Sequence, residues 1–241
     1  MAATSVVVLD RGNNTTCTVN LFGKLCLNKL FDGKRAIRGG IPFVFPQFGP
    51  WAFGPQHGFA RIARWHVEKM PERLPSGDVE ARWYCLADNC PTVAYWKWYI
   101  IIVTCCEHFV IAIQHSSTYK KCFPFQTRDS TVYQEGREVV TIGEWTDRVY
   151  QNTMQEHIIT NVVSGRKMRI QKYNFPDTVI WNPWAEYAKE IPDFGDDEFP
   201  NMVCVEAGRV ATPIVLLPGT AFEASQILQV TTTVILKTRR N

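Results

Sequence analysis

The chain has 241 residues, with 26 Lys and Arg against 23 Asp and Glu, so its formal net charge is +3. Hydrophobic residues make up 46% of the chain and charged residues 20%, which fits a globular protein and excludes disordered, collagenous and coiled-coil chains. The net charge is small and no dense tract of Lys and Arg occurs, so the composition gives no indication of a nucleic-acid binder.

Alternation of apolar and polar residues predicts β-strands along most of the chain, because such a strand presents one face to a core. The alternation occurs, in chain order, at residues 79–85, 109–113, 167–171 and 228–236. Turn residues separate these runs, at residues 75–78, 164–165, 174–177 and 218–219. A short helix is predicted at 184–190, where Pro183 and Pro192 bound it.

These elements predict an all-β fold with one domain over residues 1–241, built as an antiparallel sandwich or barrel. Residues 38–57 are rich in Gly, Pro and aromatic residues and are predicted to form a long irregular loop, a kind of segment that often carries function. The most apolar run, residues 99–106, is predicted to be a buried strand, since a bilayer-spanning helix needs about 20 residues.

The N-terminal segment and the cysteines indicate a cellular compartment. The first ten residues lack the basic start and the apolar run of a signal peptide. The eight cysteines form no Cys-x-x-Cys pair and no zinc-ligand spacing. We therefore expect free thiols, no metal site and a cytoplasmic protein.

The first candidate site residue is Arg38, which begins the run Arg-Gly-Gly-Ile-Pro. The two glycines allow the backbone to approach a ligand, and the guanidinium beside them suits an oxyanion. The alternative is a turn with a solvated Arg38. The run lacks the glycine spacing of nucleotide-binding loops.

The second candidate group is Gln56, His57 and Arg61, which surround one glycine in the run Gln-His-Gly-Phe-Ala-Arg. An amide, an imidazole and a guanidinium together suit a polyhydroxylated, anionic ligand. The alternative is a histidine that is structural or merely exposed.

Two carboxylates on predicted strands are further candidates. Asp147 and Arg148 are neighbours on one strand, so at most one of them faces a core, and a surface ion pair beside a buried Tyr150 is the alternative. Glu206 ends an apolar run, where a buried carboxylate is costly and can serve as a general base. The alternative is a strand-end glutamate in solvent.

Two further segments contain residues that could bind a ligand. The aromatic faces of Trp181 and Trp184 suit the C–H edges of a sugar ring. The acidic run at residues 193–198 lacks the ligand spacing of an EF-hand, so a solvated loop is the interpretation that we favour.

In chain order, these segments resemble the glucose-6-phosphate 1-epimerase group of the aldose 1-epimerase, or galactose mutarotase-like, superfamily. The resemblance covers nearly the whole chain, from about Val6 to the C-terminal strands. It is carried by residues 36–42, 45–49, 56–61, 146–150, 179–184, 193–197 and 201–206.

The resemblance implies a large antiparallel β-sandwich with one sugar site on its concave face. It implies an enzyme that interconverts the α and β anomers of a hexose 6-phosphate and uses no metal or organic cofactor. Arg38, Gln56 and Arg61 resemble substrate ligands, with both arginines suited to phosphate, and His57 resembles a residue that lines the sugar site.

The resemblance also implies an acid–base mechanism. Asp147 resembles a ligand of sugar hydroxyls and Glu206 resembles the catalytic carboxylate, which takes the proton of the anomeric hydroxyl. An acid protonates the ring oxygen, the ring opens to the aldehyde, C1 rotates and the ring closes on the other face.

The chain departs from the family's pattern in two places, so the sandwich is expected to lack some strands. The family's acid is a histidine in a motif like Leu-His-Thr-Tyr, and the strand that carries it is missing after Thr127. A second gap lies near Gly23, where the family has another strand. His115 and His108 are candidate replacements for the acid, although neither lies in the acid's motif.

Two functions of different classes follow. The first is a hexose-6-phosphate mutarotase that acts on glucose 6-phosphate, with altered catalysis because the acid histidine is missing. The second is a catalytically impaired or vestigial sugar-phosphate-binding protein on the same fold. A lectin-like module has the same fold class but does not account for the two arginines.

The expected partner is the same for both functions. It is a small-molecule hexose 6-phosphate, with no nucleic acid and no membrane. We expect a monomer, although exposed strand edges offer a route to self-association.

Overall fold

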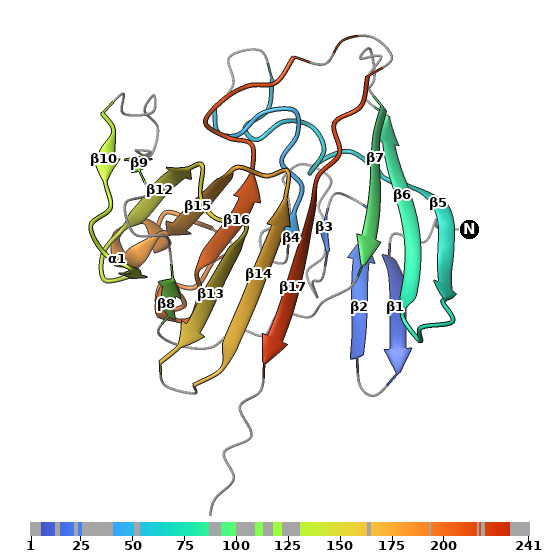
Figure 1. Cartoon of the computed structure of the whole chain (residues 1–241), viewed down its shortest axis with the longest axis horizontal. Helices are drawn as coiled ribbons and strands as arrows, with labels where there is room; N and C mark the ends of the chain where they lie inside the picture. The colour runs from blue at the N-terminus through green and yellow to red at the C-terminus, as the bar shows by residue number, and fades with distance from the viewer. Residues whose placement is uncertain are drawn as a thin grey trace, which may run out of the picture. The chain divides into compact units, whose positions relative to one another are not determined.

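The structure of the chain is a computed structural model, and Figure 1 shows its strands and short helices. It describes residues 6–12, 15–21, 24–25, 41–50, 54–86, 93–99, 109–112, 118–121, 131–162, 165–192, 194–215, 217 and 220–231. The chain divides into two compact units, Met1–Ile102 and Val103–Asn241. The prediction of one domain over residues 1–241 stays a prediction.

Strands dominate both units, and every strand pairing among the described residues is antiparallel. The predicted all-β fold is confirmed. Within the described ranges, no helix is long and apolar enough to cross a membrane. Residues 100–106 of the apolar run that we predicted as a strand lie outside the described residues.

The first unit contains two sheets. One has the strand order β1-β2-β3-β4 and the other has the order β5-β6-β7. The strands of the first sheet are β1 (Val6–Gly12), β2 (Thr15–Asn20), β3 (Lys24–Leu25) and β4 (Ile41–Pro42). Those of the second sheet are β5 (His66–Arg73), β6 (Val79–Leu86) and β7 (Val93–Tyr99). The predicted alternation at 79–85 is therefore confirmed as β6, and the predicted loop at 38–57 contains the short strand β4.

Side chains from both sheets form the core of the first unit. In β1 every second residue is buried, so that Val7 and Leu9 face inward while Val6 and Val8 are exposed. The buried members of the core are Val7, Leu9, Cys17, Leu21, Ala60, Trp65, Val79, Ala81 and Trp83. This sharing of one core by two sheets is the two-layer arrangement that alternating strands favour.

The second unit also contains two sheets, with the orders β10-β9-β12-β15-β16 and β11-β8-β13-β14-β17. The first consists of β9 (Thr118–Lys121), β10 (Tyr133–Gln134), β12 (Thr146–Gln151), β15 (Asp177–Asn182) and β16 (Cys204–Gly208). The second consists of β8 (Phe109–Ala112), β11 (Val139–Thr141), β13 (Glu156–Asn161), β14 (Lys167–Tyr173) and β17 (Ser225–Thr231). The helix α1 (Trp184–Ala188) is the predicted short helix, and the 3-10 turn η1 (Phe199–Asn201) leads toward β16.

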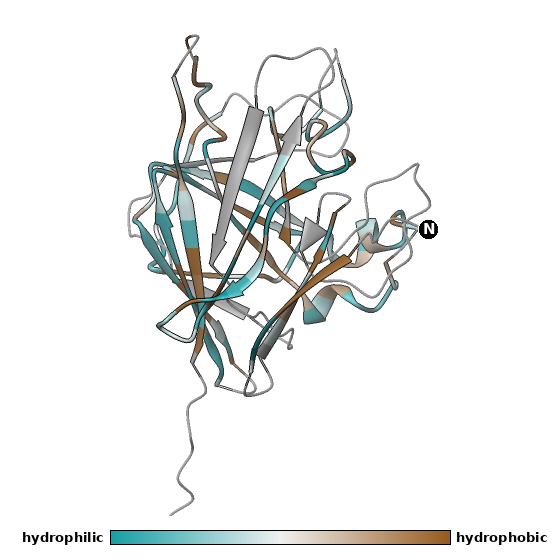
Figure 2. Cartoon of the chain, turned by 90° about the vertical axis from the view of Figure 1, so that its right-hand side faces the viewer, coloured by the Kyte–Doolittle hydropathy of each residue, from teal (hydrophilic) through white to brown (hydrophobic). Residues whose placement is uncertain are grey.

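The two sheets of the second unit also share a core. Tyr150 and Ile180 come from the sheet that holds β12 and β15, and Val140, Ile159 and Ile170 come from the other sheet. Figure 2 shows hydrophobic and hydrophilic residues interspersed along the strands, as expected of strands with one buried face. The predicted sandwich is therefore present within this unit.

A buried polar network lies on the core side of β12. Arg148 is 8% exposed, and it donates to Tyr150 Oη at 3.4 Å and to Glu144 Oε1 at 3.3 Å. Tyr150 Oη in turn donates to Glu135 Oε2 at 2.9 Å. The hydrogen bonds of Arg137 lower the pKa of Glu135, against the effect of burial and with help from Tyr150. The predicted burial of Tyr150 is confirmed. Arg148 is itself buried, unlike a residue of a surface ion pair, although its partner Glu144 is 74% exposed.

A second polar contact holds the turn before β15. Lys172 is 1% exposed, and its Nζ donates to the carbonyl oxygens of Phe175 at 2.8 Å, Pro176 at 3.0 Å and Asp177 at 3.3 Å. Burial lowers the pKa of Lys172 to about 8, against the opposing charge of Asp177. The buried ammonium therefore fixes the backbone at the start of β15 through three acceptors.

The first test concerns the core of the second unit. Ile180→Ala removes a side chain that is 0% exposed and leaves a cavity between two sheets, so we expect a loss of about 2–5 kcal/mol in the free energy of unfolding. Urea denaturation measures this loss. Val132→Ala is the matched control, because Val132 is 52% exposed and its truncation is expected to cost under about 0.5 kcal/mol. Equal effects of the two variants would contradict the assignment of Ile180 to the core.

The second test uses the titration of Lys172. In the folded chain Lys172 loses its proton above about pH 8, whereas the unfolded chain keeps it until near 10.5. Between these values the unfolded state binds more protons, so this group makes the free energy of unfolding rise with pH. We expect the stability of the wild type relative to Lys172→Met to be constant below pH 8 and to increase above it. Urea titrations of both chains on either side of that pH check this, and a constant difference would refute it.

Candidate functional site

The segment before β5 holds His57 in a defined orientation. The backbone N–H of Gly49 donates to His57 Nδ1 at 3.1 Å, and the backbone N–H of His57 donates to the carbonyl oxygen of Gly49 at 2.9 Å. The ring of Phe48 meets the imidazole edge to face, with 5.0 Å between ring centroids. Because Nδ1 accepts a hydrogen bond, the neutral imidazole carries its proton on Nε2.

Gly58 explains why this loop needs a glycine beside the histidine. Its φ is +74°, and a Cβ atom at this position would lie 2.0 Å from the carbonyl oxygen of Phe45. The same carbonyl accepts a hydrogen bond from the backbone N–H of Ala60, which is fully buried. The two parts of the loop therefore approach each other more closely than any side chain at residue 58 permits.

Hydrogen bonds also bring Gln56 and Arg61 to the same loop. Arg61 Nη2 donates to the carbonyl oxygen of Gln56 at 2.8 Å. Gln47 Nε2 donates to the carbonyl oxygen of Pro55 at 3.2 Å, which ties the start of the loop to the segment before Gln56. Gln56 is exposed and Arg61 is half-buried. The structure thus brings Gln56, His57 and Arg61 together, while Arg38 lies outside the described residues.

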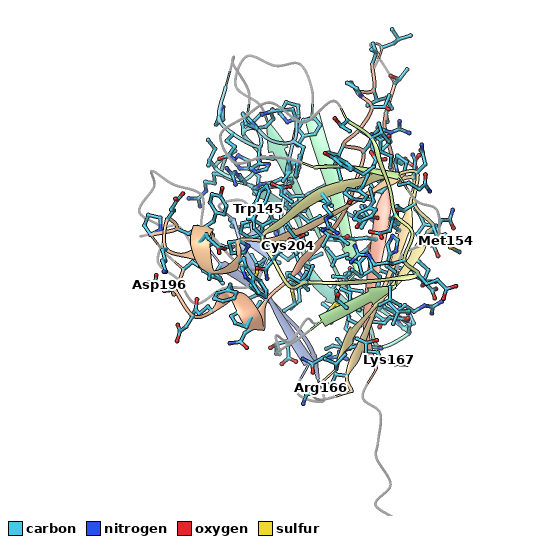
Figure 3. The ribbon with its side chains drawn as sticks, turned by 90° about the vertical axis from the view of Figure 1, so that its left-hand side faces the viewer. Trp145, Met154, Arg166, Lys167, Asp196 and Cys204 are labelled. Atoms are coloured by element: carbon cyan, nitrogen blue, oxygen red, sulfur yellow. The ribbon has the colours of Figure 1, made fainter. Side chains whose placement is uncertain are left out.

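The other candidate carboxylates share one face of the second unit's sheet. Register partners on adjacent strands point to the same face. Asp147 of β12 is the partner of Trp181 in β15, and Trp181 is the partner of Cys204 in β16. Val179, two residues from Trp181, is the partner of Glu206. Asp147, Trp181, Cys204 and Glu206 therefore form one side of the sheet, and Figure 3 labels Cys204 among the side chains of this unit.

The opposite side of this sheet faces the core of the second unit. Tyr150, Ile180 and Val205 all contribute to that core, and each lies an odd number of residues from Asp147, Trp181 or Glu206 on its own strand, so it points to the opposite side. Asp147 therefore points away from the sandwich core and Arg148 points into it. The alternation across β12, predicted from the sequence, is confirmed.

The spacing of Asp147 and Glu206 suits a ligand of the size of one sugar. They lie on strands separated by β15 and are offset by two residues, which places their Cα atoms about 12 Å apart. Both side chains are half-buried, as is Trp181, the partner of Asp147 on β15, whereas Val179, the partner of Glu206 on the same face, is 1% exposed. Two carboxylates at this spacing do not contact each other directly, and both can reach one small ligand that lies against the tryptophan. Glu206 is therefore neither fully buried nor fully solvated, the two states that the sequence left open.

Asn182, next to Trp181, has a structural role that the sequence did not reveal. Its Nδ2 donates to the carbonyl oxygens of Phe199 at 2.9 Å and Met202 at 2.7 Å, and its Oδ1 accepts from the N–H of Trp184 at 2.7 Å. It therefore joins the start of α1 to the segment that leads into β16. Trp184 packs on Phe199, with ring centroids 5.0 Å apart.

The acidic run and the cysteines fit the simpler interpretations. Asp196, Asp197 and Glu198 are exposed, and Glu198 Oε2 accepts from the backbone N–H of Gly195 at 3.0 Å. Across the described residues, no group of three or more His, Cys, Asp or Glu side chains could hold a metal ion. Cys17 is buried and Cys204 is half-buried, and neither belongs to a disulfide in the described part of the chain.

The second unit holds the two histidines that the sequence offered as replacements for the family's acid. His108, His115 and residues 122–130 lie outside the described residues, as does Gly23. His157 is described and is 1% exposed, with Nε2 at 2.9 Å from Thr178 Oγ1. Thr178 is the register partner of Tyr150, so His157 lies on the core side of the sheet and not on the side of Glu206.

Comparisons with known proteins identify relatives of this chain. The family described as aldose 1-epimerase matches residues 111–229. A protein of Cenchrus ciliaris, named “Putative glucose-6-phosphate 1-epimerase”, is 26% identical over 233 residues, which cover 79% of this chain and 69% of that protein. A protein of Escherichia coli with the same name is 26% identical over 210 residues, which cover 74% of this chain and 69% of that protein.

A solved structure extends the likeness to the fold. The crystal structure described as that of a “putative mutarotase” from Salmonella typhimurium matches with a TM-score of 0.69 and 19% identity, covering 90% of this chain and 88% of that one. The resemblance to the aldose 1-epimerase superfamily and the mutarotase-like β-sandwich fold are confirmed. The roles of the individual site residues stay predictions.

The third test concerns the loop that holds His57. Gly58→Ala places a Cβ atom 2.0 Å from a backbone oxygen at a positive φ, so we expect a loss of at least about 2 kcal/mol in the free energy of unfolding. Gly77→Ala is the control, because Gly77 also has a positive φ (+84°) but has open space around it. A loss of about 1 kcal/mol in the free energy of unfolding is expected there. Thermal or urea denaturation gives both values. A Gly58→Ala chain as stable as the control would show that the close approach to Phe45 is wrong.

Proposed function

We propose that this relative of the aldose 1-epimerases is a hexose-6-phosphate mutarotase that interconverts the α and β anomers of glucose 6-phosphate. The observation that carries the proposal is the placement of Asp147 and Glu206 on one face of the β12–β15–β16 sheet, with Trp181 on the strand between theirs. This face presents two carboxylates, which can bind and activate the hydroxyls of a sugar. It also presents an aromatic ring, which can pack on the C–H edges of the sugar ring.

Glu206 acts as the general base in this proposal. Its carboxylate accepts the proton of the anomeric hydroxyl, the bond between C1 and the ring oxygen breaks, and an acid delivers a proton to that oxygen. The aldehyde then rotates about the C1–C2 bond. Ring closure reverses the two proton transfers, so Glu206 returns the proton and the acid recovers its own.

The remaining site residues bind the substrate. Asp147 accepts hydrogen bonds from sugar hydroxyls, and the ring of Trp181 packs against the C–H edges of the sugar. The resemblance, and not the geometry, assigns four residues of the first unit to the substrate: Arg38 and Arg61 to the phosphate, for which a guanidinium supplies several N–H donors in a fixed plane, and Gln56 and His57 to the sugar.

A second candidate function is a sugar-phosphate-binding protein with impaired catalysis. One observation favours it. The histidine in the described part of the second unit, His157, lies on the core side of the sheet and not beside Glu206, where the mechanism needs an acid. Loss of a general acid reduces a rate by about 10²–10⁴-fold, so a chain without one retains the sugar site but turns over slowly.

The fourth test measures anomer exchange in glucose 6-phosphate by NMR saturation transfer. We expect the wild-type chain to accelerate exchange and Glu206→Gln to lose about 10²–10⁴-fold of that acceleration, because the amide cannot take a proton. Glu138→Gln is the control, since Glu138 is exposed and is not part of the carboxylate face. It is expected to leave the rate unchanged.

The same experiment separates the two functions. Binding of glucose 6-phosphate by the folded chain without any acceleration supports the second function and excludes the first. Equal acceleration by the wild type and Glu206→Gln would remove Glu206 from the mechanism. A folded chain that neither binds the sugar phosphate nor accelerates its exchange contradicts both functions.

A further inference from the structure

Asp177 is a buried carboxylate that the proposed chemistry does not use. It is the first residue of β15, is 2% exposed, and is the register partner of Gly208 in β16. In the sequence it belongs only to a predicted turn. Burial of a charged side chain is costly unless hydrogen bonds compensate, so its partners indicate what it does.

The partners of Asp177 are backbone groups of two other segments. Its Oδ2 accepts from the N–H groups of Val210 and Ala211, both at 2.8 Å, and these residues come two and three positions after the end of β16. Its Oδ1 accepts from the N–H of Asn152 at 3.3 Å, directly after β12. One carboxylate thus joins the ends of the three strands that hold the carboxylate face.

The strand that carries Glu206 depends on such an anchor. β16 is an edge strand of its sheet, so among the described strands of that sheet its ladder of hydrogen bonds runs to β15 only. Glu206 is paired with Val179, two residues from Asp177, and lies four residues before Val210. The bonds from Asp177 to residues 210 and 211 therefore fix the end of β16 within a few residues of the proposed base.

Lys172 fixes Asp177 in turn. Its Nζ donates to the carbonyl oxygen of Asp177 at 3.3 Å and to those of Phe175 and Pro176. The backbone at the start of β15 is thus held from the core side, while the carboxylate holds the two neighbouring chain segments. The arrangement is a rigid support and not a flexible surface contact, because both charged residues are at most 2% exposed.

We propose that Asp177 is a positioning residue for the sugar site: its carboxylate holds the exit of β16, and thereby the distance of Glu206 from the anomeric hydroxyl. This inference rests on the proposed function. A general base must lie within hydrogen-bond reach of the proton that it takes, and a displacement of about 1 Å can reduce a rate by about 10²-fold. Loss of the Asp177 anchor therefore reduces kcat more than it weakens substrate binding.

The fifth test compares three variants of the chain. Asp177→Ala removes both acceptor oxygens and with them all three hydrogen bonds, whereas Asp177→Asn keeps one oxygen that can still accept from Val210 and Ala211. Thr153→Val is the matched control: Thr153 is also buried and its hydroxyl bonds to Thr178 on β15 at 2.8 Å, so the change removes a buried hydrogen bond to β15 and leaves the bonds of Asp177 to Val210 and Ala211 in place. Two readouts are taken, amide hydrogen exchange at residues 204–211 and the kinetics of anomer exchange in glucose 6-phosphate.

We expect Asp177→Ala to speed amide exchange at residues 204–211 and to lower kcat by about 10–100-fold with a smaller change in KM. Asp177→Asn is expected to recover part of both losses. Thr153→Val is expected to lower the melting temperature without a selective effect on residues 204–211 and without a shift in the pH profile of kcat, whereas Asp177→Ala shifts that profile because Glu206 changes its surroundings.

Each contrary outcome has a distinct meaning. An active wild type with an unchanged kcat in Asp177→Ala overturns the positioning role and leaves the proposed function standing. A loss of kcat in Thr153→Val as large as in Asp177→Ala, at equal stability, also overturns it. A folded wild type that does not accelerate exchange overturns the proposed function, and unchanged amide protection at residues 204–211 in Asp177→Ala would show separately that the anchor is absent.

Discussion

The antiparallel register of β12, β15 and β16 is the constraint on which the account of this chain depends. Successive residues of a strand point to opposite faces, so the register decides which side chains meet on each side. In the observed register Asp147 and Glu206 share one face, while Arg148 and Val205 point to the other. A slip of one residue in β16 would move Glu206 into the sandwich core. The contacts that fix the register therefore also fix the position of the proposed base.

Buried polar groups provide part of that hold. Apolar contacts such as those of Ile180 and Ile159 stabilise the folded chain, but they tolerate small shifts of one strand along another, because the hydrophobic effect has no direction. Hydrogen bonds to charged groups are directional and costly to leave unmade. Arg148 and Tyr150 tie the central strand β12 to Glu144 and Glu135 from the core side, and Asp177 holds the strand ends. The sandwich therefore combines an apolar interior with a few ionic contacts that specify its alignment.

The sequence predicted the strands better than it predicted the contacts between them. Alternation at 79–85 and 167–171 corresponds to β6 and β14, because period two is a local property of the chain. The sequence did not predict the burial of Arg148. Arg148 bonds to Tyr150, which in turn bonds to Glu135, and no local sequence pattern indicates that contact. The sequence did not predict the role of Asp177, because its partners are backbone N–H groups 33 and 34 residues away. Every residue except proline has such a group, so the side chains of Val210 and Ala211 do not indicate the contact. The likeness to known epimerases supplied the site residues that periodicity did not distinguish.

A crystal structure of the chain with glucose 6-phosphate bound tests the central claim most directly. We expect the sugar ring to lie on the face formed by Asp147, Trp181 and Glu206, with both carboxylates within about 3 Å of sugar hydroxyls. The anomeric hydroxyl is expected beside Glu206. A sugar phosphate that binds this chain at another place, with Glu206 out of hydrogen-bond reach of C1, would contradict the account, whatever the activity of the chain.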